Sequence, residues 1–186
     1  MVCARLQLLV CAVILVIVPV SSGQLKNSCR TSSLPSGAKA LLDAKYADWR
    51  PKDVSDLGAD DKGLWTKPHP KDCPGIAIGH FEEPERLSYA VLLVPNSELK
   101  HGYQIIVLRE PPTGDAYTAT LLDEADGEYS SSGLVISRVP PGEYSDFEDT
   151  ASVRVKLDAV NVEWIEKGAV VYYWANGTYH TIQTSD

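Results

Sequence analysis

Short apolar runs, several of them alternating with polar residues, fill the second half of the chain. Gly, Pro, Asn and Ser bound these runs, and this pattern predicts β-strands. The predicted strands lie at residues 76–81, 88–94, 103–109, 116–122, 133–138, 153–164, 169–175 and 178–182. Residues 88–94 are apolar almost throughout, which predicts a central strand covered on both faces. The short connections between the strands favour a largely antiparallel sheet.

The apolar positions change phase in the last third of the chain. They are odd-numbered from 153 to 159 and even-numbered from 160 to 164. Because successive residues of a strand face opposite sides of the sheet, this change requires a bulge or a break near Ala159–Val160.

One amphipathic helix is predicted near the N-terminus, between Ser36 and Pro51. Its stripe consists of Ala38, Leu41, Leu42, Lys45, Tyr46 and Trp49. Ser36 can cap this helix and Pro51 ends it. Residues 50–75 are rich in Asp, Lys, Gly and Pro and predict a long ordered loop that contains Trp65. Together these elements predict an α+β, β-rich fold, a mostly antiparallel sheet with one N-terminal helix packed on it.

A β-hairpin is predicted around Asn176-Gly177, which lies between two apolar and aromatic runs. Both residues of such a turn adopt positive φ, and Asn-Gly suits this requirement. The turn predicts three cross-strand pairs: Trp174 with Tyr179, Tyr173 with His180, and Val171 with Ile182. Both faces of the hairpin are apolar or aromatic. One face therefore meets the core, and the other is either covered by the helix or exposed for binding.

Residues 1–23 have the layout of a secretory signal peptide. One positive charge precedes the apolar run 6–18, and small residues follow it. The run is shorter than the roughly 18 to 20 residues that span a bilayer. Cleavage before Gly23 or before Gln24 fits equally well, and an uncleaved anchor is the alternative. The predicted location is secreted or periplasmic, with no stable membrane anchor after cleavage.

The mature chain, residues 24–186, is predicted to form one domain with two cysteines, Cys29 and Cys73. In an exported protein such a pair favours a disulfide, although two buried free thiols are the alternative. The bond would close a loop of about 45 residues and stabilise the fold by on the order of 4 kcal/mol. It would hold together an arm, helix and loop within residues 24–75, ahead of a β-sheet region at 76–186.

The chain is acidic, with 17 Lys and Arg against 25 Asp and Glu and a formal net charge of −8. Removing Arg5 with the signal peptide changes this charge to −9. An acidic balance argues against binding nucleic acid or an anionic membrane through charge. The charged fraction of 23% and the aromatic fraction of 8% are typical of a globular protein rather than a disordered one.

The sequence predicts no catalytic residue, no cofactor and no metal. It has no Gly-x-Ser-x-Gly turn, no His-Glu-x-x-His and no Cys-x-x-Cys pair. The groups weighed for such chemistry are His80, His101 and His180 for zinc, and the neighbouring acids Glu82–Glu83 and Glu148–Asp149 for acid–base catalysis. Their positions favour exposed loop histidines and solvated acids.

Residues 79–92 resemble the calcium loop of FG-GAP and VCBS-type repeats, with the pattern Gly-Asp-Phe-Asp/Asn-Gly-Asp-Gly-x-x-Asp-Tyr-Ala-Val. The matching residues are Gly79, Phe81, Tyr89, Ala90 and Val91. The family's oxygen ligands would lie at His80, Glu82, Pro84 and Ser88. Calcium takes about six to eight oxygens, whereas His80 offers nitrogen and Pro84 no side-chain oxygen. The resemblance therefore implies a strand–loop–strand shape without a calcium site.

The chain also resembles a family of uncharacterised small exported bacterial proteins. The likeness lies in Cys-Pro-Gly at 73–75 and in the ending, Tyr-Trp-x-Asn-Gly-x-Tyr followed by Thr-Ser-Asp. This resemblance implies an exported location and no particular activity.

Four aromatic residues form the candidate binding surface: Trp65, Tyr172, Trp174 and Tyr179. Aromatic side chains combine a large apolar area with polar groups and are enriched at binding surfaces. The predicted function is that of an exported, non-enzymatic binding or interaction protein, whose partner is an unidentified protein or carbohydrate. The alternatives are a small secreted hydrolase whose site is not visible in the sequence, and a structural accessory domain. Residues 176–178 also match an N-glycosylation sequence.

Overall fold

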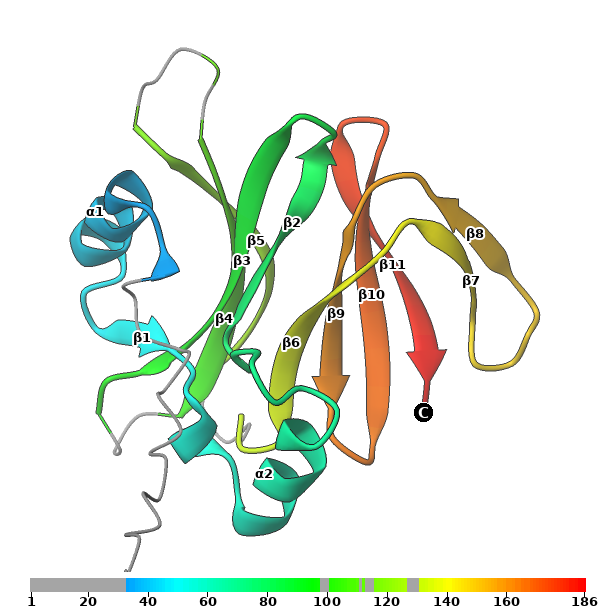
Figure 1. Ribbon diagram of the computed structural model, residues 1–186, viewed down its shortest axis with the longest axis horizontal. Coiled ribbons are helices and arrows are strands. Elements are labelled where there is room, and N and C mark those ends of the chain that lie inside the picture. Colours follow the sequence, from blue (N-terminus) through cyan, green and yellow to red (C-terminus); the bar gives the residue numbers. More distant parts are fainter. Residues whose placement is uncertain (1–32, 98–100, 111, 113–115, 127–130) are drawn as a thin grey trace, which may run out of the picture.

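The computed structural model describes residues 33–97, 101–110, 112, 116–126 and 131–186. Two antiparallel sheets pack face to face, with a helix on the outer side of the first sheet and a small hairpin on the outer side of the second (Figure 1). This arrangement confirms the predicted β-rich α+β class. It differs from the prediction in having two facing sheets rather than one.

The first sheet is built around a central strand, β3. Its members are β1 (Trp49–Pro51), β2 (Ile76–Glu83), β3 (Arg86–Pro95), β4 (Gly102–Arg109) and β5 (Thr118–Asp126). The order is β1-β3-β4-β5, and β2 pairs with β3 as well. Strands β1 and β2 share one edge of β3, because β1 pairs with its last residues and β2 with its first. Strand β5 is the opposite edge of the sheet.

The second sheet has the order β11-β10-β9-β6. Its members are β6 (Leu134–Val139), β9 (Ala159–Trp164), β10 (Gly168–Ala175) and β11 (Thr178–Ser185). Between β6 and β9 the chain forms a separate hairpin of β7 (Gly142–Ser145) and β8 (Ser152–Val155). This excursion explains the predicted change of phase, because β8 belongs to the small hairpin and β9 to the main sheet.

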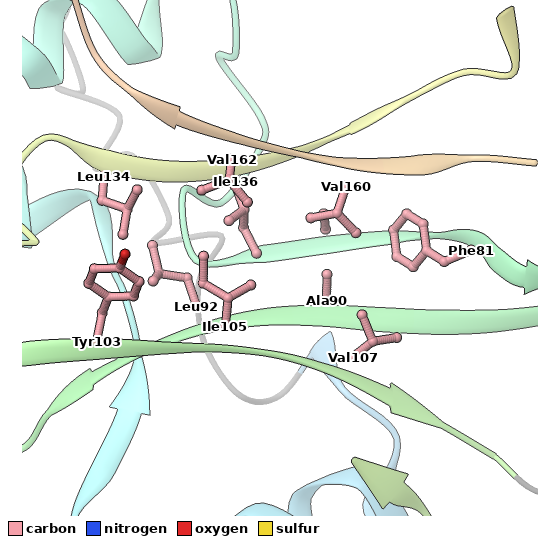
Figure 2. Packing of buried hydrophobic residues seen from close by; sticks show 11 residues of the cluster. Phe81, Ala90, Leu92, Tyr103, Ile105, Val107, Leu134, Ile136, Val160 and Val162 are labelled. Carbon is pink, nitrogen blue, oxygen red and sulfur yellow. The ribbon is translucent and has the colours of Figure 1, made fainter. Parts of the chain in front are cut away.

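The two sheets are held together by an apolar layer between them, which we call the inter-sheet core (Figure 2). Its buried members are Ala77, Phe81, Ala90, Leu92, Tyr103, Ile105 and Val107 from the first sheet and Leu134, Ile136, Val160 and Val162 from the second. Phe81 is fully buried, as are the facing side chains of β3 and β9 and, in β4, Ile105 and Val107. Alternate residues of each strand point into this layer, as the period of a strand requires.

Helix α1 (Ser36–Lys45) covers the other face of the first sheet. Ala38 and Leu42 of the helix pack against Val91 and Leu93 of β3. Since Ala90 and Leu92 of β3 face the inter-sheet core, the strand is covered on both sides, as its apolar sequence predicts.

The predicted helix is too long at its C-terminal end. It ends at Lys45, and Trp49–Pro51 forms β1, which pairs with the end of β3. The backbone N–H of Asn96 donates to the carbonyl oxygen of Asp48 and holds the intervening turn against β3. Ser36 is the first helical residue and makes no capping hydrogen bond. Strand pairing therefore outweighs the helical spacing of Trp49.

The prediction of a long loop over residues 50–75 is wrong. Besides the end of β1, this segment contains a 3₁₀-helix, η2 (Val54–Asp56), and a second helix, α2 (Ala59–Thr66). Trp65 of α2 is 3% exposed and packs with Leu57, Val135 and Ile165 on the outer face of the second sheet. This eight-residue helix is mostly polar, so its sequence shows no helical spacing of apolar residues. It is stabilised by the packing of the Trp65 ring.

The β10–β11 hairpin has the predicted register. Trp174 pairs with Tyr179, Tyr173 with His180, and Val171 with Ile182. Asn176 and Gly177 have φ values of 53° and 83°, as the turn requires. Residues 79–92 form the β2–β3 hairpin and so have the strand–loop–strand shape that the resemblance implies.

The predicted signal peptide at residues 1–23 and Cys29 lie outside the described residues. Cys73 is buried at 6% exposure and forms a β-bridge with Ile76 just before β2. The Cys29–Cys73 disulfide therefore stays a prediction.

We expect the mature chain, residues 24–186, to show no reactive thiol when it is unfolded without reductant, because the predicted disulfide would bond both of its cysteines. Reduction should expose two, as counted with a chromogenic thiol reagent. The variant Cys29→Ser should expose one thiol before reduction and unfold more readily, by up to about 4 kcal/mol. Two thiols in the unreduced wild-type protein would contradict the disulfide.

Gly79 lies where β2 packs most closely against the second sheet. A Cβ atom at Gly79 would lie 2.8 Å from the Phe81 ring, 3.0 Å from Cδ of Arg138 and 3.1 Å from Cβ of Asp158. We expect Gly79→Ala to lower the free energy of unfolding by about 1–3 kcal/mol, measured by urea denaturation.

Gly63 of α2 offers a matched control, because a Cβ atom there would have no neighbour within 4 Å. Gly63→Ala should raise the free energy of unfolding by about 0.5–1 kcal/mol, since alanine favours the helix. Equal effects of the two substitutions would show that the close approach at Gly79 costs nothing.

Candidate functional site

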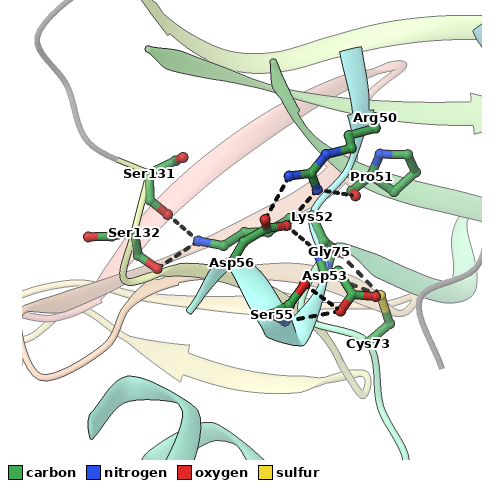
Figure 3. A network of polar contacts seen from close by, with 10 residues as sticks. All are labelled: Arg50, Pro51, Lys52, Asp53, Ser55, Asp56, Cys73, Gly75, Ser131 and Ser132. Carbon is green, nitrogen blue, oxygen red and sulfur yellow. Dashed lines mark hydrogen bonds and ion pairs between the residues drawn. The ribbon is translucent and has the colours of Figure 1, made fainter. Parts of the chain in front are cut away.

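A buried lysine, Lys52, joins the segment after β1 to the residues that lead into β6 (Figure 3). Its side chain is fully buried, and Nζ donates hydrogen bonds to the carbonyl oxygens of Ser131 and Ser132, the second at 2.8 Å. Its backbone N–H donates to the carbonyl oxygen of Leu92 in β3 at 2.9 Å. Lys52 thus bonds to the first sheet through its backbone and to the second through its side chain.

The backbone around Lys52 is tightly packed as well. A Cβ atom at Gly75 would lie 2.3 Å from the Lys52 carbonyl oxygen, so the two chain segments touch without room for a side chain. Beside them, Nη1 and Nη2 of Arg50 donate to the two carboxylate oxygens of Asp56 at 2.6 and 2.7 Å (Figure 3). This bidentate pair fixes the 3₁₀-helix next to Lys52.

Burial lowers the pKa of Lys52 to about 8, although the carboxylates of Asp56 and Asp61 favour its charged form. A lysine with a lowered pKa is a candidate nucleophile. Two carbonyl oxygens occupy its Nζ, however, and Lys52 lines neither of the two cavities described next. We therefore assign it a structural role.

The first of these cavities, which we call the charged cavity, has a volume of about 400 Å³ and lies between β2 and β6. Its lining residues are Ser33, His69, Lys71, Asp72, Cys73, Ile76, Ala77, Ile78, Ile136, Ser137 and Arg138. Nδ1 of His69 lies 3.1 Å from Oδ2 of Asp72, and the imidazole stacks on the Trp65 ring at 4.2 Å. An imidazole held by a carboxylate is the arrangement of a general base, although this carboxylate is mostly exposed.

Asp158, which is buried, contacts Arg138, one of the residues that line the charged cavity. Its Oδ1 accepts a hydrogen bond from Arg138 at 3.0 Å, and its Oδ2 accepts one from the backbone N–H of His80 at 2.8 Å. This carboxylate therefore ties β2 of the first sheet to β6 of the second.

The three histidines considered for zinc lie apart. Nδ1 of His80 is 3.1 Å from the carbonyl oxygen of Arg86, whereas Nε2 of His180 is 3.2 Å from that of Ala175. His101 is exposed just before β4. Within the described residues, no three His, Cys, Asp or Glu side chains are grouped so that they could hold a metal.

The expectation of solvated acids is wrong for Glu82, whose side chain is 2% exposed. Its Oε2 lies 3.0 Å from Nη1 of Arg109, and its Oε1 accepts a hydrogen bond from the Tyr179 hydroxyl at 3.2 Å. Glu83, its neighbour, pairs with Arg86 in the hairpin turn. Glu148 and Asp149 are exposed as expected. A register shift in β2 between Gly79 and Glu83 interrupts the alternation of the strand, so Glu82 as well as Phe81 contacts the second sheet and is buried.

The second cavity, which we call the aromatic groove, also has a volume of about 400 Å³. Its lining residues are Thr120, Leu121, Leu122, Tyr172, Trp174, Gly177, Thr178, Tyr179 and Thr181. It lies between β5, the edge strand of the first sheet, and the β10–β11 hairpin of the second. Three of the four predicted binding residues therefore line one cavity. The fourth, Trp65, is buried elsewhere, between α2 and the outer face of the second sheet.

The rings of the aromatic groove are held in place from behind. The Tyr179 hydroxyl bonds to Glu82, and burial together with this carboxylate raises the pKa of Tyr179 far above its ordinary value. Burial, followed by the nearby Asp123 carboxylate, raises the pKa of Tyr172 to about 12. The Trp174 and Tyr179 rings meet edge to face, with centroids 5.0 Å apart. These contacts fix the positions of the rings that line the groove.

A β-bulge shapes the opposite wall. Ile106 pairs with Leu121 and Ile105 with Asp123, so Leu122 is an extra residue in β5. A bulge bends and twists an edge strand and redirects its side chains. Here it brings two successive residues, Leu121 and Leu122, to the groove.

The residues of β5 were missed because they lie some 50 positions from the hairpin in sequence. The alternation of Thr118, Thr120 and Leu122 shows which side of β5 they share, but not which strand they face. Nothing in the sequence indicates that Glu82 and Arg109 form an ion pair, because this pairing depends on how distant strands are placed in the fold.

The lowered pKa of Lys52 makes the stability of the fold depend on pH. Between pH 8 and 10.5 the native Lys52 loses its proton while the unfolded one keeps it. Raising the pH in this window therefore favours the native state, with a slope of up to about 1.4 kcal/mol per pH unit. We expect the wild-type free energy of unfolding to rise relative to that of Lys52→Met between pH 8 and 10, measured by urea denaturation.

The exposed Lys67→Met serves as the control and should keep the wild-type pH slope. The comparison stops at pH 10 because tyrosines begin to ionise in the unfolded state there, which opposes the effect of Lys52. Equal slopes for wild type and Lys52→Met would contradict the lowered pKa.

No protein-family model, curated protein or solved structure matches this chain. In the part of the chain that the structure describes, no helix is both long enough and apolar enough to cross a bilayer. The two cavities and the residues that line them are therefore the candidate sites of this protein.

Proposed function

We propose that this protein is an exported, non-enzymatic binding protein that takes its ligand in the aromatic groove. The observation that carries the proposal is the convergence of Tyr172, Trp174 and Tyr179 on one cavity of about 400 Å³. A volume of this size lies in the range of small-molecule sites, roughly 300–1,000 Å³. Mixed aromatic, aliphatic and hydroxyl lining is also typical of such sites.

The lining of the aromatic groove supports binding rather than catalysis. Among its described residues there is no histidine, carboxylate, amine or thiol that could transfer a proton near neutral pH or act as a nucleophile. The tyrosines Tyr172 and Tyr179 have raised pKa values, which makes them poor acids at that pH.

Export supports the proposal from the sequence side. The signal-peptide pattern at residues 1–23 and the predicted Cys29–Cys73 disulfide both fit a secreted or periplasmic protein. An acidic surface suits a ligand that is neither nucleic acid nor an anionic membrane.

A hydrolase at the charged cavity is the second candidate. The observation in its favour is the His69–Asp72 pair, 3.1 Å apart, with Ser33 and Ser137 lining the same cavity. The two candidates use different cavities, so one experiment separates them.

We test the proposal by titrating the isotopically labelled exported protein with neutral, cationic and anionic small-molecule fragments, followed by nuclear magnetic resonance. The readout is the indole N–H signal of Trp174, assigned by its loss in Trp174→Phe. Fragments that bind should shift this signal and leave that of the buried Trp65 unchanged, because Trp65 lies under α2.

The two cavities give different patterns of shifts. Fragments that shift Trp65 and the residues around His69, but not Trp174, would move the function to the charged cavity and favour the hydrolase. If no fragment shifts either indole, the protein binds no small ligand at these cavities and the accessory-domain alternative replaces the proposal.

A further inference from the structure

The aromatic groove is lined by uncharged residues throughout. None of its nine described lining residues carries a charge, in a chain of which 23% is Asp, Glu, Lys or Arg. The charged cavity has a similar volume but is lined by His69, Lys71, Asp72 and Arg138. The difference in chemistry between the two cavities points to a neutral ligand for the groove.

The carboxylates nearest to the groove are already paired. Glu82 forms an ion pair with the Arg109 guanidinium and accepts a hydrogen bond from the Tyr179 hydroxyl. Asp123 accepts a hydrogen bond from Tyr103 at 3.0 Å, and its carboxylate is near enough to Tyr172 to help raise the pKa of that phenol. A cationic ligand would have to compete with these internal partners, and an anionic ligand would face carboxylates without a free cation in the lining. Both would lose solvation without a new ion pair.

The groups that remain for a ligand are aromatic rings and hydroxyls. Trp174 and Tyr179 are half-buried at the groove. Their rings contact each other edge to face, and the Tyr179 hydroxyl bonds to Glu82 within the protein. Thr120 contributes a hydroxyl from the first sheet, and Thr178 and Thr181 contribute hydroxyls from the second. Each hydroxyl can both donate and accept a hydrogen bond.

We propose that the ligand of the aromatic groove is a neutral carbohydrate, bound as a terminal sugar or a short oligosaccharide. A sugar ring has an apolar C–H face that packs on an aromatic ring, and hydroxyls around its edge that pair with threonine hydroxyls. The volume of about 400 Å³ is at the small end of the usual range, which suits a small number of sugar rings. The inference rests on the proposed function, since it names the ligand of the same groove.

Trp174 is the residue at which the inference is tested best. Tyr172 and Tyr179 pack against the inter-sheet core, so their truncation would also disturb the fold. Thr181 offers a milder second variant, Thr181→Val, which keeps the shape and removes the hydroxyl. Tyr173 provides the matched control. It lies on the same strand but on the opposite face of the second sheet, where it packs against Val155, Ala159 and Val171.

The probes are soluble trisaccharides in neutral and charged pairs of the same sugar series: galactotriose with trigalacturonate, and tri-N-acetylchitotriose with its deacetylated, cationic form. Neutral trimers of glucose, xylose and mannose complete the set. Affinity is measured by isothermal calorimetry, and the site by the shift of the Trp174 indole N–H signal.

We expect at least one neutral trisaccharide to bind and to shift the Trp174 signal, and the charged form of its pair to bind at least about tenfold more weakly. Trp174→Ala should weaken binding about tenfold or more, because it removes the stacking ring. Thr181→Val should weaken it about three- to tenfold, the range of one hydrogen bond. Tyr173→Ala should change it less than about twofold.

Each of three results would overturn the inference. Equal or tighter binding of the charged trisaccharides would show that the groove does not select a neutral ligand. An effect of Tyr173→Ala as large as that of Trp174→Ala would place the sugar on the other face of the hairpin. Fragments or peptides that shift Trp174 while every neutral trisaccharide fails to do so would leave the proposed function standing and remove carbohydrate as its ligand. If Trp174→Ala does not fold, Thr181→Val and the paired trisaccharides decide.

Discussion

The inter-sheet core is the interaction on which the rest of the structure depends. Eleven buried apolar side chains fill the space between the two sheets, and most of them are fully buried. Each Val, Leu, Ile or Phe in such a position contributes about 1.5–3 kcal/mol. The aromatic groove begins where this layer ends, between β5 and the β10–β11 hairpin. Its shape is therefore a consequence of how closely the sheets approach.

Three buried charges set the relative position of the sheets. Lys52 bonds from the first sheet to the residues before β6, Asp158 from the second sheet to β2, and Glu82 from β2 to Tyr179 of β11. Burying a charge is costly unless its partners are in place, so an altered packing of the sheets would leave these groups unsatisfied. Apolar packing alone would tolerate small displacements, whereas these bonds favour a single arrangement. Glu82 links this constraint directly to the groove.

The sequence predicts what depends on neighbouring residues and fails where distant segments meet. The alternation of apolar residues predicts the main strands, and Asn176-Gly177 predicts the hairpin register to the residue. Strand β1 and helix α2 were missed because they are short and are stabilised by contacts with β3 and through Trp65. Tyr172, Trp174 and Tyr179 of the predicted surface line one cavity, but β5, which completes this cavity, could not be assigned to it without the fold.

Under the proposed function, the aromatic residues of the groove divide their roles between stability and binding. Tyr172 and Tyr179 pack against the inter-sheet core, and the Tyr179 hydroxyl bonds to Glu82 of the first sheet, so their positions are determined by folding. Trp174 is outside that cluster and touches it through the edge of Tyr179. Tyr172 and Tyr179 thus support the Trp174 ring, which does not itself pack in the inter-sheet core. Because β5 and the hairpin belong to different sheets, a ligand on this ring would contact both sheets at once, and its binding would stabilise the folded protein by mass action.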